Sequence, residues 1–137
     1  MKHFLFLSAL LLAFACTPPA SRETFIPGEG PYVFTVEMAE QCAYDFDLFT
    51  RIDATEYPSR LRLDIGWKSP DDSLFRETVY LPVTRGRSFF DQEAYAPYRS
   101  GVVPAVPGTW TVTVTVPQAP EGLRGMGLVT RRYPEKQ

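Results

Sequence analysis

The acidic side chains are the first residues to test for chemistry. Asp45, Asp47 and Asp64 could form the carboxylate pair that cleaves a glycosidic bond. All three alternate with apolar residues, a pattern that predicts solvated carboxylates on the outward faces of β-strands. Asp91 and Glu93 could bind calcium, but two acids cannot supply the about six to eight oxygen ligands of that ion. We therefore expect no catalytic carboxylate pair and no metal site.

Histidine and cysteine are too scarce for the common catalytic sites. His3 is the sole histidine, and it lies in an N-terminal segment that we expect to be removed. Its loss excludes a Ser-His-Asp triad, a Cys-His pair and a histidine-ligated zinc site. Cys42 then has no histidine to activate its thiol, and its expected role is that of a small buried apolar residue. The chain also lacks a phosphate-binding G-x-x-x-x-G-K-[ST] motif, so the sequence predicts a protein that is not an enzyme and has no cofactor.

The N-terminus resembles a bacterial lipoprotein export signal. Lys2 precedes an apolar run, Phe4–Phe14, that is about half of the ~20 residues needed to span a bilayer as a helix. We expect residues 1–15 to be a signal peptide, cleaved after Ala15, and lipid to be attached to Cys16. The alternative is an ordinary signal peptide cut at the same small residues, with Cys16 incidental. Each buried CH₂ contributes about 0.8 kcal/mol, so several acyl chains would hold the mature protein on a membrane.

Strand-like alternation of apolar and polar residues dominates the rest of the chain. Residues 16–30 are rich in proline, glycine and polar residues, and we expect a lipidated tether there, followed by one folded domain over residues 31–133. Residues 85–107 show no regular pattern and predict either one short helical turn or an edge strand. Six segments alternate clearly: Tyr32–Met38, Tyr44–Ile52, Leu61–Trp67, Phe75–Val83, Trp110–Val116 and a short one around Met126 and Leu128.

These segments together predict the fold class. Each has one apolar and one polar face, so a single open sheet would expose its apolar face to water. Two sheets that bury their apolar faces against each other avoid this exposure. We therefore predict an all-β protein, an antiparallel β-sandwich with a jelly roll as one possible topology, preceded by the cleaved lipoprotein signal peptide. The formal net charge of −2 gives no basic surface for binding nucleic acid.

A set of motifs spreads over residues 24–131. Its residues are Tyr44, Arg51, Thr55, Tyr57, Pro58, Leu61, Leu63, Pro70, Asp71, Gly108, Thr109, Trp110, Gly127 and Leu128. This set is similar to the gliding motility lipoprotein family of the GldH type. The resemblance implies an outer-membrane lipoprotein that is a non-catalytic structural component of a gliding motility or type IX secretion assembly. It also implies partner proteins in the cell envelope, and it assigns no catalytic residue.

Six residues are candidates for contact with a partner or ligand. Arg51 could meet a carboxylate of a partner, although pairing with a strand acid such as Asp64 is the simpler expectation. Tyr57 precedes Pro58, a combination that favours a rigid turn over a recognition motif. The aromatic residues among the candidates would stack on sugars or anchor a partner if exposed, and would otherwise cap one open end of the sandwich. The candidates are Arg51, Tyr57, Phe89, Phe90, Tyr95 and Tyr98.

Two classes of function follow. The first is the membrane-tethered assembly component, and the alternative is a carbohydrate-binding β-sandwich module of the envelope. A planar, exposed row of aromatic rings flanked by Asp or Arg would favour sugar binding, whereas an exposed apolar patch without polar partners would favour a protein partner. Acidic residues just after the lipid cysteine resemble the surface-export signal of lipoproteins in bacteria with this family. No such run follows Cys16, so the resemblance implies an outer-membrane protein that faces the periplasm. A tether reaching Phe25 would span at most about 30 Å.

Overall fold

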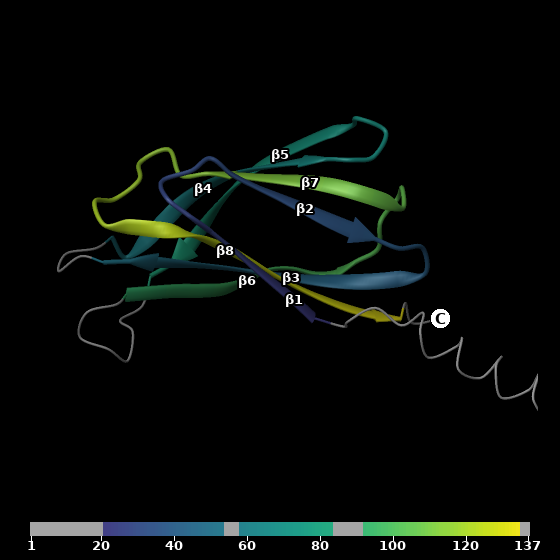
Figure 1. Ribbon diagram of the computed structural model, residues 1–137, viewed down its shortest axis with the longest axis horizontal. Coiled ribbons are helices and arrows are strands. Elements are labelled where there is room, and N and C mark those ends of the chain that lie inside the picture. The colour runs from purple at the N-terminus through teal and green to yellow at the C-terminus, as the bar shows by residue number, and fades with distance from the viewer. Residues whose placement is uncertain (1–20, 54–57, 84–91, 135–137) are drawn as a thin grey trace, which may run out of the picture.

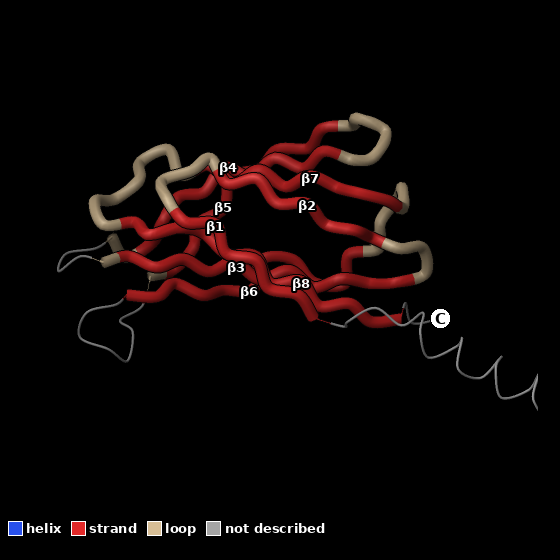
Figure 2. The backbone as a smooth tube through the Cα atoms, viewed as in Figure 1, coloured by secondary structure: helices blue, strands red, loops and turns tan. Residues whose placement is uncertain are grey.

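The computed structural model describes residues 21–53, 58–83 and 92–134, without the side chains of residues 92–94. These residues form eight β-strands, and no helix lies among them (Figures 1 and 2). The all-β prediction is therefore confirmed. The strands are β1 (Ser21–Pro27), β2 (Tyr32–Met38), β3 (Cys42–Ile52), β4 (Arg60–Lys68), β5 (Leu74–Pro82), β6 (Gln92–Val102), β7 (Gly108–Thr115) and β8 (Leu123–Pro134).

The strands make two four-stranded antiparallel sheets. Sheet A has the order β1-β8-β3-β6, and sheet B has the order β2-β7-β4-β5. Figure 1 shows the two sheets as separate layers, with sheet B above sheet A. Strand β1 pairs with β8, β2 with β7, β3 with β6 and β4 with β5, so the chain runs as one long hairpin rolled into two layers. This pairing is that of an eight-stranded jelly roll, the topology considered from the sequence.

The core lies between the sheets and follows the predicted alternation. On β2, Tyr32 and Phe34 are buried, while Val33 between them is exposed. On β7, Val112 and Val114 are fully buried and come from alternate positions of the threonine-rich strand. The buried apolar side chains of both sheets form one cluster, because each strand turns its apolar face inward. Cys42 is half-buried and packs against this cluster, as expected for a small apolar residue.

A polar network lies where β5 and β6 meet at one edge of the sandwich. Trp67 donates its indole N–H to the Tyr98 hydroxyl oxygen at 2.9 Å, and that hydroxyl donates to Glu77. The Arg99 guanidinium pairs with Glu77 at 2.5 Å. Burial, together with the hydrogen bond to Glu77, raises the pKa of Tyr98 to about 12, so the phenol stays protonated at neutral pH. The network therefore joins the edges of the two sheets through neutral and paired groups.

Two elements differ from the expectations, and a third confirms one of two alternatives. Ser21–Pro27, placed in the tether, is strand β1 and pairs with β8 over seven residues. The sequence did not reveal this strand, because its side chains add only Ile26 to the core and show no apolar alternation. Gln92–Val102 is strand β6 at the edge of sheet A, which confirms the edge strand as one of the two alternatives predicted for this region. Phe75 was predicted to face the core, but it is 52% exposed on edge strand β5, where its ring contacts the Arg99 guanidinium.

Candidate functional site

Three aromatic side chains line up across the outer face of sheet A. Phe25 of β1 lies opposite Gly127 of β8, Gly127 lies opposite Phe49 of β3, and Phe49 lies opposite Tyr95 of β6. Residues directly opposite each other in an antiparallel sheet share a face, so these positions form one line across all four strands. We call Phe25, Phe49 and Tyr95 the aromatic row. Phe25 and Tyr95 are exposed, and Phe49 between them is half-buried.

The rings of the aromatic row lie nearly parallel to one another. The centroids of Phe25 and Phe49 are 5.9 Å apart with 20° between the ring planes. The centroids of Phe49 and Tyr95 are 6.5 Å apart with 25° between the planes. Offset parallel rings of this kind stabilise each other by about 0.5–1.5 kcal/mol per pair. The row is therefore a preformed apolar surface of nearly parallel rings.

Two glycines of β8 form the floor beneath this surface. A Cβ on Gly127 would lie 2.0 Å from Phe49 Cζ, and one on Gly125 would lie 2.5 Å from Phe25 Cζ. Both distances are far below a van der Waals contact, so only glycine lets the two rings lie against the β8 backbone. Glycine within a strand commonly marks such a close approach. The rings are thus held in position by the sheet beneath them.

A charged pair supports the Tyr95 end of the aromatic row. Asp47 on β3 is buried, and its Oδ2 accepts hydrogen bonds from the Tyr95 hydroxyl and from Arg131 Nη1 at 2.7 Å. The hydrogen bond from Arg131 holds the pKa of Asp47 below its ordinary value, against the opposing effect of burial. The hydrogen bond to Asp47 raises the pKa of Tyr95, so its hydroxyl stays protonated. Asp47 was predicted to be solvated; it is buried because Tyr95 and Arg131 satisfy its charge.

The other predicted charges on this face are also engaged. Asp45 accepts hydrogen bonds from the Gly101 backbone N–H at 2.8 Å and from the Tyr133 hydroxyl at 2.9 Å. Arg51 is exposed on β3, opposite Gly125, near the aromatic row. The expected pairing of Arg51 with Asp64 is wrong, because Asp64 lies on β4 in the other sheet. There Asp64 contacts Arg62 and accepts a hydrogen bond from Thr78.

The aromatic candidates from the sequence divide between the two faces of β6. Tyr95 points outward into the aromatic row, whereas Tyr98 packs against the core beside Trp67 and caps the sandwich edge. Side chains three positions apart in a strand point to opposite faces, as those of Tyr95 and Tyr98 do. The lipidation, partner-binding and calcium-binding candidates Cys16, Tyr57, Phe89, Phe90 and Asp91 lie outside the described residues.

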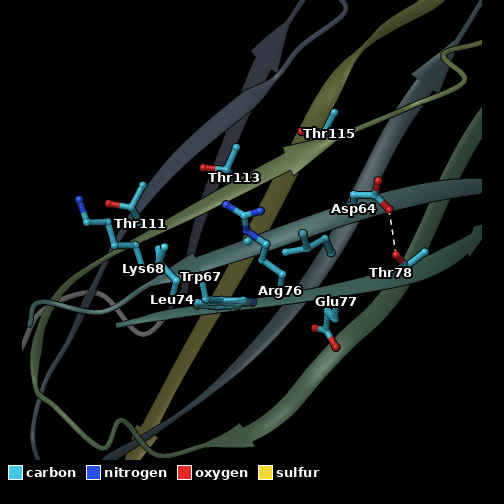
Figure 3. A pocket seen from close by; sticks show the side chains of 12 residues that line it. Asp64, Trp67, Lys68, Leu74, Arg76, Glu77, Thr78, Thr111, Thr113 and Thr115 are labelled. Carbon is cyan, nitrogen blue, oxygen red and sulfur yellow. Dashed lines mark hydrogen bonds between the residues drawn. The ribbon is translucent and has the colours of Figure 1, made fainter. Parts of the chain in front are cut away.

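The outer face of sheet B carries a different kind of site. A shallow hollow of about 630 Å³ lies over β4, β5 and β7, and Figure 3 shows the side chains around it. Gly66 leaves the hollow open, since no atom lies within 4 Å of where its Cβ would be. Charged and hydroxyl side chains make up most of the rim, among them Lys68, Arg76 and the row Thr111, Thr113 and Thr115. This face therefore offers hydrogen bonds and charge in place of a ring surface.

Neither face has the residues of a metal centre or of paired catalytic acids. Within residues 21–53, 58–83 and 92–134, no three side chains of His, Cys, Asp or Glu gather at one point. Asp45 and Asp47 lie on sheet A and Asp64 lies on sheet B, so the three acids do not converge. The described part of the chain also contains no helix long and apolar enough to cross a membrane.

Comparison with models of known protein families gives no match, and no curated protein matches the chain. The similarity to gliding motility lipoproteins therefore stays a prediction from the residues quoted above. Two members of the aromatic row, Phe25 and Phe49, were not among the residues predicted for the site. One signal was present for Phe49, a large apolar residue that alternates in phase with Asp45, Asp47 and Arg51. No comparable signal marks Phe25, because its neighbours in the row come from distant parts of the chain.

Proposed function

We propose that this protein is a non-catalytic binding module of the cell envelope that holds a carbohydrate chain on the aromatic row. The observation that carries the proposal is the line of nearly parallel rings of Phe25, Phe49 and Tyr95, exposed at both ends and flanked by the Asp47–Arg131 pair. This is the arrangement that distinguishes sugar binding from an unspecific apolar patch.

The chemistry of a sugar ring suits such a surface. A pyranose has apolar C–H groups on its faces and hydroxyls around its rim, so its face stacks on an aromatic ring while its hydroxyls seek polar partners. The Tyr95 hydroxyl donates to Asp47 and keeps its oxygen available as an acceptor. Arg131 remains partly exposed beside the row and has further N–H groups to donate. Several adjacent rings favour an oligosaccharide over a single sugar.

The rigidity of the row favours measurable affinity. The rings lie against the backbone at Gly125 and Gly127, and the Tyr95 hydroxyl is fixed on Asp47. Binding to a surface that is already ordered loses little side-chain entropy. Because the acids nearby are paired and do not converge, the proposal assigns binding and no bond cleavage.

The predicted lipid anchor would place this module at a membrane surface. If Cys16 carries lipid, it lies five positions before Ser21, the first residue of β1, with four residues between them. A chain of that length spans at most about 18 Å, which is shorter than the tether expected from the sequence. We propose a periplasm-facing position at the outer membrane, where glycan strands of the cell wall lie within reach. Fractionation of a Cys16→Ala variant, which should leave the membrane fraction, checks the anchor.

A role as a component of a motility or secretion assembly is the second candidate. Phe, Tyr and Arg are also the residue types that anchor protein interfaces, and Phe25, Tyr95 and Arg131 lie together on one face. In that case the aromatic row would contact a protein in the envelope. The two candidates use the same surface, so the ligand that it binds decides between them.

Titration of the full chain with defined oligosaccharides tests the proposal. We expect binding of at least one of cellohexaose, chitohexaose and soluble peptidoglycan strands, and a loss of about tenfold or more in affinity for Phe25→Ala and Tyr95→Ala. Phe75→Ala is the matched control, because Phe75 is similarly exposed but lies on β5 outside the row. Absence of binding to all three ligands would reject the carbohydrate. Recovery of one cross-linked envelope protein that the Tyr95→Ala variant fails to capture would then support the second candidate.

A further inference from the structure

The hollow on the outer face of sheet B contains a cationic side chain, Arg76, that no residue described in the structure neutralises. Arg76 lies directly opposite Gly66, which in turn lies opposite Thr113 of β7. Figure 3 shows the Arg76 side chain extending from β5 across β4 toward Thr113. Among the residues that the structure describes, none forms an ion pair or hydrogen bond with the Arg76 side chain.

The acids closest in the sheet are engaged elsewhere. Asp64 contacts Arg62 and accepts a hydrogen bond from Thr78, which Figure 3 marks with a dashed line. Glu77 follows Arg76 in the chain, but it points to the opposite face, where it pairs with Arg99. Asp64 and Glu77 line the hollow together with Lys68 and Arg76, but both acids have other partners, so neither neutralises Arg76.

Other donors surround Arg76 on the same face. Thr111 and Thr113 turn their hydroxyls outward on β7, and Lys68 lies beside Thr111 (Figure 3). Lys68 pairs with Asp72 at 3.3 Å, but both side chains are more than half exposed. Such an exposed pair contributes little to stability, so Lys68 can turn to another anion.

We infer that this hollow is a binding site for an oxyanion, a carboxylate or a phosphoryl group, on a small ligand or on one unit of a larger one. A guanidinium binds two oxygens of such a group at once, and the threonine hydroxyls and Lys68 supply further donors around it. Gly66 provides the space, because any larger side chain there would stand in the hollow. The site is independent of the aromatic row, which lies on the other sheet.

Nuclear magnetic resonance titration of the full chain tests the inference with three small probes: glucuronate, inorganic phosphate and neutral glucose. We expect one or both anions to shift the backbone amide signals of Gly66 and Thr113, and glucose to leave them unchanged. Tighter binding of glucuronate would identify a sugar acid as the source of the oxyanion, and tighter binding of phosphate would identify a phosphoryl group. Either result supports the site.

Two variants and one control locate the binding. Arg76→Gln should lower the affinity for the anion by about tenfold or more, since it removes a charge-assisted contact. Gly66→Leu should do the same by filling the hollow while Arg76 remains. Arg60→Gln removes an equal charge from the outer face of β4, where Arg60 lies over the Tyr80 ring outside the hollow, and should leave the affinity unchanged. If neither anion shifted the Gly66 and Thr113 amide signals, or if Arg60→Gln and Arg76→Gln lost equal affinity, the inference would be overturned. Neither result bears on binding of neutral oligosaccharides by the aromatic row.

Discussion

On the outer face of sheet A, Gly125 and Gly127 are covered by the rings of Phe25 and Phe49, whereas on the outer face of sheet B the space above Gly66 is open. All three glycines lie inside β-strands, so their position in the secondary structure does not distinguish them. The neighbouring strands make the difference. An aromatic ring beside the glycine covers it with an apolar surface, and charged or hydroxyl neighbours leave an open hollow rimmed by polar side chains.

The strongest test of this contrast uses two neighbouring residues of β7. Val114 is fully buried between the sheets, and Thr113 faces outward in the hollow of sheet B. Val114→Asp buries an unpaired charge and should cost several kcal/mol, close to the whole stability of a small domain. Thr113→Asp should change the free energy of unfolding by less than about 1 kcal/mol. Urea denaturation measures both, and equal losses would mean that the outer face of sheet B is not open to solvent.

Substitution of the strand glycines should have the next largest effect on stability. Gly125→Ala would place a Cβ 2.4 Å from the Ile26 carbonyl oxygen as well as against the Phe25 ring, so strand β1 has to move. We expect a loss of about 1–3 kcal/mol from overpacking, together with weaker oligosaccharide binding. Gly66→Ala is the matched change on sheet B, and it should leave stability equal or raise it by about 0.4–1 kcal/mol. If Gly125→Ala melted at the wild-type temperature, the ring could not be resting on the glycine as described.

The smallest effect concerns the acids on the two faces. Asp47→Asn should cost about 1 kcal/mol at neutral pH, because Arg131 loses a buried charged partner. The folded protein lowers the pKa of Asp47, so its contribution is complete above the ordinary value of 3.8 and is lost as the pH falls through the lowered pKa. The stability difference between wild type and Asp47→Asn should therefore shrink in acid. Asp64→Asn on sheet B should have little effect at any pH, since its contacts are exposed. A constant difference from pH 7 to pH 2 for Asp47→Asn would contradict the assigned pairing.

The strands of the core were predictable because apolar residues occupy every second position and those positions are buried, as Tyr32, Phe34 and Val36 are. Edge strands were not, since β1 contributes only Ile26 to the core and β6 contains Pro97. The aromatic row could not be read from local pattern at all. Phe25, Phe49 and Tyr95 become neighbours only through the register of four strands, and that register joins residues more than seventy positions apart.

Strand β1 also has a mechanical consequence. A pull directed along β1 from the chain before Ser21 loads all seven residue pairs of its ladder with β8 in shear, so they share the force and do not open one at a time. Phe25 belongs to this strand and cannot stay in the aromatic row once β1 has left. Any tension great enough to strip β1 from the sandwich therefore dismantles the row in the same event, while the core contacts between β2, β3, β4 and β7 are still in place.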